Sequence, residues 1–181
     1  MRAFFGISLP SQIRREVKGF TDNVRSQLPR MKWVEADNLH ITLRFLGEVD
    51  EGRIPDISSA AEDAAKYQKQ FKVILGRLGA FPNPRKARVF WWGLEKGAEE
   101  SATLFTNLER GLVAMGFNPE RKRYHPHITL ARLRNPTQLP IDSFSVVKDL
   151  SFTTDGFTLF QSTLTPQGPI YKIVKEFKLD G

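Results

Sequence analysis

The chain has 181 residues, of which 40% are hydrophobic and 26% charged, and it contains no cysteine. This composition is typical of a folded globular protein, and the lack of cysteine excludes disulfides and thiolate chemistry. No apolar run in the sequence approaches the roughly 18 residues of a membrane-spanning helix. The net charge of +7 favours a polyanionic partner such as nucleic acid. Because the first residues lack the apolar segment and cleavage site of a signal peptide, we expect a cytoplasmic protein.

Short apolar segments alternate with helical patterns in the first half of the chain. Residues 2–8 predict a strand, and Pro10-Ser11 opens a helix whose apolar residues recur at helical spacing: Ile13, Val17, Phe20, Val24 and Leu28. A strand follows at about 39–46, and Gly47 and the turn at 50–52 terminate it. A second helix is indicated by Ile54, Ile57, Ala61 and Ala64, and two strands by residues 71–78 and 87–94.

The same order then repeats. A helix carries Phe105, Leu108, Leu112 and Met115, a strand follows near 127, a short helix is expected near 137–147, and two strands are expected near 151–163 and 169–179. The leading helices begin near 11 and 98, a displacement of 87 residues. We therefore expect one bilobal α+β domain over residues 1–181, built from approximate repeats 11–94 and 98–179. Two antiparallel sheets with outer helices would face each other across a central cleft, related by a pseudo-two-fold axis.

The tetrapeptide His-Ile-Thr-Leu occurs at His40–Leu43 and again at His127–Leu130, also 87 residues apart, and includes two of the three histidines. Successive side chains on a strand point to opposite faces. His40 and Thr42 should therefore project together, as should His127 and Thr129, while the Ile and Leu of each copy point into a core.

Two opposed histidines can divide acid–base catalysis, since one can deprotonate a nucleophile while the other protonates a leaving oxygen. The threonine hydroxyls can donate to the oxygens of a phosphate diester, where negative charge develops in the transition state. A 2′,3′-cyclic phosphate is strained, so we expect its hydrolysis to need no metal.

Other uses of these residues are less well supported. His125 and His127 could share a metal, but stable sites usually take three or four ligands, and neither His strand carries an adjacent Asp or Glu on the same face. A Gly-x-Ser-x-Gly elbow and a phosphate-binding Gly-x-x-x-x-Gly-Lys-Ser/Thr loop are both missing from the sequence. We expect neither a metal nor a cofactor.

The chain resembles the two-histidine (2H) phosphoesterase superfamily and, within it, the RNA 2′,3′-cyclic phosphodiesterases, also called the 2′-5′ RNA ligase or LigT-like family. The resemblance spans nearly the whole chain, and both motifs are intact. It rests on the segments RAFFGISLP (2–10), WV (33–34), NLHITLRFLG (38–47), VFWWGL (89–94) and HPHITLAR (125–132).

The resemblance implies roles for individual residues. His40 would be the proton donor to the leaving 3′-oxygen and His127 the proton acceptor that activates water, giving a 2′-phosphomonoester. Thr42 and Thr129 would bind phosphoryl oxygens. Arg132 would contact phosphate or base, which requires a bulge because strict alternation places it opposite His127.

Aromatic residues are candidates for base stacking. Among Phe5, Trp33, Trp91 and Trp92, the resemblance favours Phe5 as the cleft residue. Basic clusters at 121–123 and 132–134 flank the second motif, and we expect them to attract phosphate.

The partner we expect is an RNA or oligonucleotide that ends in a 2′,3′-cyclic phosphate, bound by a monomer with no membrane contact. Reverse 2′-5′ RNA ligation is implied as a side activity. One alternative is a non-catalytic RNA-end binding module, although intact histidines argue against it. Another is a phosphodiesterase for a small cyclic nucleotide or an ADP-ribose cyclic phosphate.

Overall fold

The computed structural model describes residues 1–146 and 149–180 of the chain. Within these residues three α-helices, α1 (Ser11–Val24), α2 (Ile54–Lys66) and α3 (Ala98–Ala114), accompany nine strands. The strands are β1 (Arg2–Ser8), β2 (Lys32–Trp33), β3 (His40–Glu48), β4 (Phe71–Phe81), β5 (Ala87–Lys96), β6 (His127–Thr137), β7 (Ser151–Thr154), β8 (Gly156–Thr165) and β9 (Gly168–Lys178). They pair antiparallel in the order β7-β4-β5-β6-β3-β1-β8-β9, and β2 pairs with β6. The predicted α+β class is confirmed.

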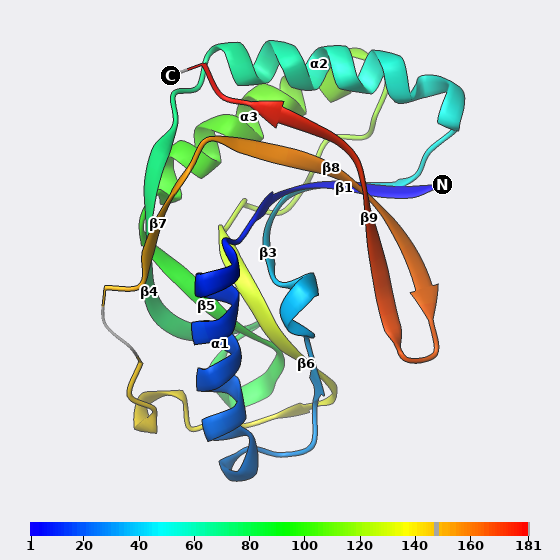
Figure 1. Ribbon diagram of the computed structural model, residues 1–181. Coiled ribbons are helices and arrows are strands. Elements are labelled where there is room, and N and C mark those ends of the chain that lie inside the picture. The colour runs from blue at the N-terminus through cyan, green and yellow to red at the C-terminus, as the bar shows by residue number, and fades with distance from the viewer. Residues whose placement is uncertain (147–148, 181) are drawn as a thin grey trace.

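Two four-stranded halves of this sheet meet at its centre. The two predicted sheets are thus joined, but only through the residue pair Ile41–Ile128 of β3 and β6. In Figure 1 helices α2 and α3 run along the half that contains β1, β8 and β9, while α1 lies against the other half. The sheet is strongly curled, so its two halves face different directions around β3 and β6.

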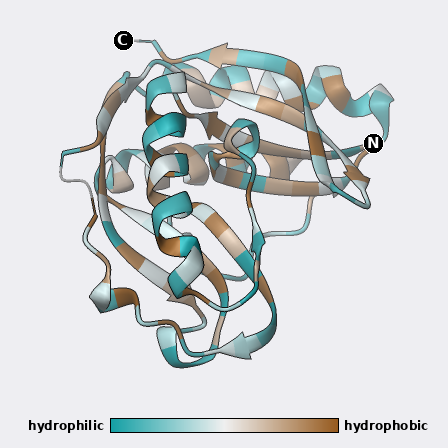
Figure 2. Cartoon of the chain, turned by 60° about the horizontal axis from the view of Figure 1, so that its bottom comes forward, coloured by the Kyte–Doolittle hydropathy of each residue, from teal (hydrophilic) through white to brown (hydrophobic). Residues whose placement is uncertain are grey.

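The helices pack through the apolar faces that their spacing predicts. In α1 the buried apolar residues are Ile13, Val17, Phe20 and Val24, and the Phe20 ring lies 4.9 Å from that of Trp92 on β5. Helix α3 is tied to β3 by the buried Arg44, whose guanidinium donates to the Glu109 carboxylate. Figure 2 shows hydrophilic and hydrophobic residues alternating along these elements, as expected for surface helices over a sheet.

Some local expectations differ from the structure. Helix α1 ends at Val24 and α3 at Ala114, so Leu28 and Met115, which the apolar spacing predicts within them, lie beyond their ends. In place of a helix near 137–147, the part up to residue 146 holds the end of β6 and a 3₁₀ turn at Ile141–Ser143; residue 147 lies outside the described residues. Pro140 has no N–H to donate and interrupts a helix there. The single strand expected at 151–163 divides at Asp155, because β7 pairs with β4 whereas β8 pairs with β1 and β9. The two-residue strand β2 was not predicted.

The displacement of 87 residues recurs in the strand registers. Against β1 the strand β3 has an unpaired residue at Leu43 and a second at Leu46. Against β5 the strand β6 has one at Leu130 and a further register shift between Arg132 and Thr137. Leu43 and Leu130 are 87 positions apart, as are Ile41 and Ile128. We propose that residues 11–94 and 98–179 are two copies of one unit within a single bilobal domain. Among the described residues no helix is long and apolar enough to cross a membrane.

Candidate active site

The two motifs meet at the centre of the sheet. Because β3 and β6 run antiparallel and pair at Ile41–Ile128, His40 lies beside Thr129, and Thr42 lies beside His127. Both isoleucines are fully buried, so these four polar side chains share the opposite face. We call His40, Thr42, His127 and Thr129 the His-Thr cluster. Each histidine thus neighbours the threonine of the other motif.

His40 is held in one orientation and one tautomer. Its Nδ1 lies 2.7 Å from the backbone oxygen of Asn38, and because a carbonyl only accepts, Nδ1 carries the proton in the neutral ring. Its Nε2 then carries the lone pair and lies 3.0 Å from the Thr42 hydroxyl. The ring packs on Phe4, with centroids 4.9 Å apart, and meets Tyr171 edge-on at 5.4 Å.

His127 is held in the same way on the other strand. Its Nδ1 lies 2.6 Å from the backbone oxygen of His125, which leaves Nε2 as the basic nitrogen of the neutral ring. The Phe81 ring meets it edge-on at 5.0 Å, and Trp91 lies 6.0 Å away. In both motifs the residue two positions before the histidine supplies the carbonyl that fixes its tautomer.

Both histidines favour the neutral form in the unliganded protein. Burial, opposed in part by the Asn38 carbonyl and reinforced by His127 and Arg132, lowers the pKa of His40 from 6.5 to about 4. Burial also lowers the pKa of His127, and the nearby His125 and Arg132 lower it further. Either ring can therefore accept a proton at neutral pH, whereas a donor must gain its proton when an anion binds beside it.

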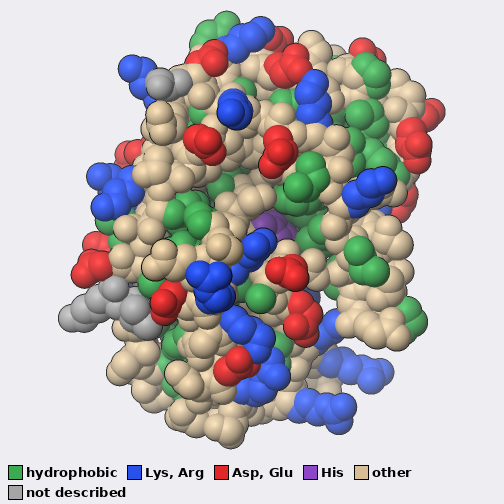
Figure 3. All heavy atoms as spheres, viewed as in Figure 1, with side chains coloured by type: hydrophobic (Ala, Val, Ile, Leu, Met, Phe, Trp, Pro, Cys, Tyr) green, Lys and Arg blue, Asp and Glu red, His purple; other side chains and the backbone are tan. Residues whose placement is uncertain are grey.

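A cavity of about 540 Å³ opens on the His40 side of the cluster. Its lining includes His40, Thr42 and Thr129, whereas His127 lies next to the cavity and not in its wall. The other lining residues are Lys32, Trp33, Val34, Glu35, Asn38, Phe45, Arg132, Thr165, Gln167, Gly168, Pro169, Ile170 and Tyr171. Figure 3 shows histidine at the bottom of a hollow, with Lys and Arg side chains gathered below it in that view.

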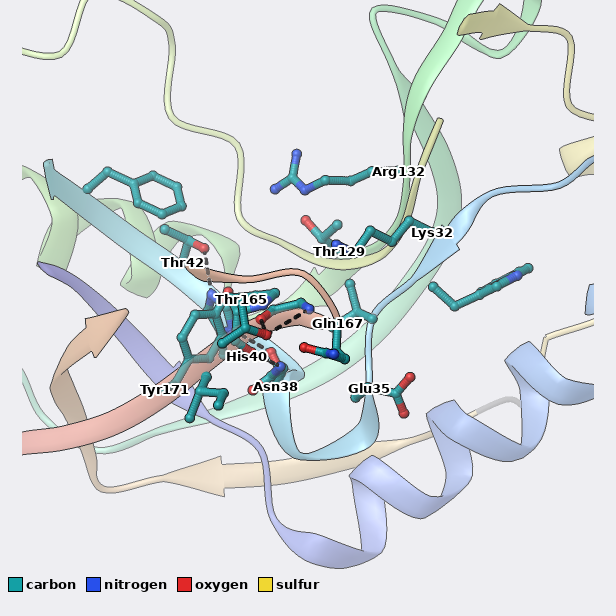
Figure 4. A pocket seen from close by; sticks show the side chains of 16 residues that line it. Lys32, Glu35, Asn38, His40, Thr42, Thr129, Arg132, Thr165, Gln167 and Tyr171 are labelled. Atoms are coloured by element: carbon teal, nitrogen blue, oxygen red, sulfur yellow. Dashed lines mark hydrogen bonds between the residues drawn. The ribbon is translucent and has the colours of Figure 1, made fainter. Parts of the chain in front are cut away.

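Arg132 reaches the cavity because β6 is bulged. The extra residue Leu130 shifts the alternation, so Arg132 returns to the face of Thr129, and the bulge that its assignment requires is present. Figure 4 shows the Arg132 guanidinium extending beside Thr129 toward Thr42. In the opposite half the corresponding bulge turns Phe45, 50% exposed, into the same cavity.

The choice of Phe5 as the cleft residue is wrong. Phe5 is fully buried and packs edge-on against Phe157 and Phe177, with centroids 5.9 Å away in both cases, on the helix-covered side of the sheet. The neighbouring Phe4 points the other way and packs on His40. Strand alternation requires the two rings to face opposite sides, and the sequence alone did not determine which side was the cleft.

The three tryptophans take different places. Trp92 is a core residue that donates to the backbone oxygen of Gly76 at 2.8 Å. Trp91 is buried beside the second motif, and Trp33 is half-buried and lines the cavity. Trp33 is therefore the tryptophan best placed to touch a ligand in the cavity.

Comparison with known proteins agrees with this geometry. The family model described as LigT-like phosphoesterase matches residues 7–91 and 93–171. The chain belongs to this family. An RNA 2′,3′-cyclic phosphodiesterase of Methanothermobacter thermautotrophicus is 35% identical over 99% of both chains, and one of Aeropyrum pernix is 42% identical over 82% of this chain and 86% of its own. The crystal structure of Escherichia coli LigT with 3′-AMP superposes with a TM-score of 0.82 at 27% identity, over 99% of this chain and 98% of that one.

Sequence reasoning missed the part of this LigT-like site that comes from the β8–β9 hairpin. Thr165, Gln167 and Tyr171 line the cavity, more than 120 positions from His40 along the chain, and no motif marks them. Asn38 was also missed, although its signal was visible two positions before His40. Its side chain donates to the Pro169 oxygen at 2.8 Å and so fastens the hairpin over the cavity.

The metal alternative gains no support from side-chain placement in this LigT-like protein. Over residues 1–146 and 149–180, no three His, Cys, Asp or Glu side chains gather closely enough to hold an ion. The His125 and His127 rings lie 6.0 Å apart and tilted, without a third ligand group beside them in that part of the chain. Of the two basic clusters, the one at 132–134 reaches the cavity through Arg132, whereas residues 121–123 are exposed and outside its lining.

Proposed function

We propose that this protein hydrolyses a 2′,3′-cyclic phosphate at the end of an RNA or oligonucleotide to a 2′-phosphomonoester, without a metal ion or cofactor. The single observation that carries the proposal is the His-Thr cluster, three of whose four residues line a nucleotide-sized cavity. The curated relatives named RNA 2′,3′-cyclic phosphodiesterase support the same substrate class.

In the proposed reaction His127 accepts one proton and His40 donates another. The Nε2 of His127 accepts a proton from water as the water oxygen attacks phosphorus. The bond between phosphorus and the 3′-oxygen breaks, and protonated His40 gives its Nε2 proton to that oxygen. Proton exchange with solvent then restores both rings.

The position of the cavity supports this division of roles. The leaving 3′-oxygen remains part of the nucleoside, which needs more room than a water molecule. Space for a nucleoside exists on the His40 side, since His40 lines the cavity, whereas His127 lies outside the lining and is flanked by Phe81 and Trp91. The donor therefore lies beside the nucleoside, and the acceptor lies on the water side.

The other polar residues bind the phosphate. Thr42 and Thr129 donate hydroxyl hydrogens to the non-bridging oxygens, and Arg132 adds a charge-assisted contact. In the unliganded protein the Thr42 hydroxyl contacts His40 Nε2, so phosphate binding would exchange that contact for one to oxygen. A bound anion also raises the pKa of His40, which supplies the proton that the donor needs.

Reverse 2′-5′ ligation follows from the same geometry if a 5′-hydroxyl replaces water at His127. We further propose that the enzyme acts as a monomer in the cytoplasm, which light scattering of the purified protein and cell fractionation would test.

The direct test is phosphorus NMR of the protein with 2′,3′-cyclic AMP in excess EDTA. Wild type should give the 2′-monophosphate, and His40→Ala and His127→Ala should each lose turnover by about 10²–10⁴-fold while still binding the product. A 3′-monophosphate product, or turnover that returns only when a metal is added, would contradict the proposal. Binding of the cyclic nucleotide without any turnover by wild type would favour the non-catalytic RNA-end module.

A further inference from the structure

Cationic side chains continue beyond the cavity along β6. Arg132 and Arg134 are both exposed, and Leu133 between them is buried, so the two arginines share the open face of the strand. Residues two apart on a strand are separated by about 7 Å. The open face of β6 thus presents His127, Thr129, Arg132 and Arg134 in sequence, running from the reacting centre out over the surface.

Two neighbouring strands place further cations beside this row. Lys32 on β2 is the register partner of Arg132 and lines the cavity. On the other side Arg88 of β5 donates from its guanidinium to the Arg134 backbone oxygen at 3.1 Å. We call Lys32, Arg88, Arg132 and Arg134 the cationic strip. All four side chains are exposed, and none forms an ion pair with a carboxylate of residues 1–146 or 149–180.

The cyclic phosphate accounts for only one end of this strip. Arg132 is near enough to both histidines to lower their pKa values, so it belongs to the reacting phosphate. Arg88 and Arg134 lie outside the cavity lining, so the proposed reaction assigns them no contact. Beside Lys32, Trp33 lines the cavity and adds an aromatic ring. Cations in a row together with an aromatic side chain are typical of surfaces that bind single-stranded nucleic acid.

We propose that the nucleotides preceding the cyclic phosphate lie along the cationic strip, so that the enzyme selects oligonucleotides over mononucleotides. This inference rests on the proposed function and adds the path of the substrate. The terminal nucleotide occupies the cavity, and its 5′-phosphate and the one before it meet Arg88 and Arg134. A protein or membrane surface would be a less suitable partner for a strip only about three strands wide.

The test compares two substrates in each protein: uridine 2′,3′-cyclic phosphate and hexauridylate ending in a 2′,3′-cyclic phosphate. In wild type the kcat/KM for the hexamer should exceed that for the mononucleotide and should fall more steeply with KCl. In the double variant Arg88→Gln, Arg134→Gln the ratio of the two values should fall about tenfold at low salt, and the salt slope for the hexamer should lessen by about 1.4, since each single-strand phosphate contact contributes about 0.7.

Arg110→Gln is the matched control, because Arg110 is exposed on α3 and lies outside the cavity lining. It should leave the ratio unchanged. Equal kcat/KM for the two wild-type substrates, or an unchanged ratio in the double variant, would overturn the cationic strip while leaving the proposed function intact. If wild type hydrolysed neither substrate, the proposed function itself would fail.

Discussion

The buried neutral state of His40 predicts a pH-dependent loss of stability. In the unfolded chain a histidine has its ordinary pKa near 6.5, whereas in the folded protein burial lowers the pKa of His40 to about 4. Between these values the unfolded chain binds a proton that the folded protein does not, so the free energy of unfolding decreases as pH falls. Moving the pKa from 6.5 to about 4 corresponds to about 3 kcal/mol, since each unit is worth about 1.4 kcal/mol.

Urea unfolding followed by the fluorescence of the three tryptophans measures this effect. We expect wild type to lose about 3 kcal/mol relative to His40→Gln between pH 7 and pH 4, with the rest of the pH dependence common to both proteins. His125→Gln is the matched control. Because the His125 side chain is exposed, its effect should be much smaller. Nitrogen-15 NMR of the imidazole rings should show that the neutral His40 ring carries its proton on Nδ1. A titration of His40 near 6.5, or a difference in unfolding free energy between the two proteins that stays constant with pH, would contradict a buried, neutral His40.

Three further predictions concern the rate and the residues that support the site. Burial lowers the pKa of both histidines of the His-Thr cluster. If they are the acid and the base, the bell-shaped pH profile of kcat/KM, which reports the free enzyme, should have its maximum below pH 6.5; a maximum above pH 7.5 would contradict this. A methyl group at Gly6 would lie 3.1 Å from the Ile41 oxygen and 3.2 Å from His40 Cδ2, so Gly6→Ala should displace the His40 ring and lower kcat about tenfold. Gly19→Ala is the control, because Gly19 has open space around it, and it should leave kcat unchanged. Glu109→Gln leaves the buried Arg44 without its charged partner and should destabilise the fold by about 2–4 kcal/mol in urea unfolding, whereas a change below the error of the measurement would show that the pair is dispensable.

The parts of the fold that follow from local patterns could be predicted from the sequence. The apolar spacing of α1 and the alternation in each His-Ile-Thr-Leu copy are properties of neighbouring residues, and both predict the buried faces correctly. The position of Arg132 in the cavity requires a bulge, and the strict alternation of side chains along a strand does not predict one. The structure supplies that bulge at Leu130.

The rest of the site depends on pairings between distant segments. Tyr171 approaches His40 only because β8 and β9 pair beside β1, and no local pattern specifies that order. The same order decides that Phe4 faces the histidine and Phe5 faces the core. The division at Asp155 likewise reflects a strand that leaves one half of the sheet for the other.

The central claim is that His40 protonates the leaving oxygen and His127 activates water. The most direct measurement uses adenosine 2′-O,3′-S-cyclic phosphorothiolate, whose thiolate leaves without needing a proton, and compares wild type with the two single alanine variants. If His40 is the donor, His40→Ala should recover to within about tenfold of wild type on this substrate, while His127→Ala should remain slower by about 10²–10⁴-fold. Recovery of His127→Ala instead would reverse the two roles. Recovery of neither variant would contradict an acid–base division between the two histidines.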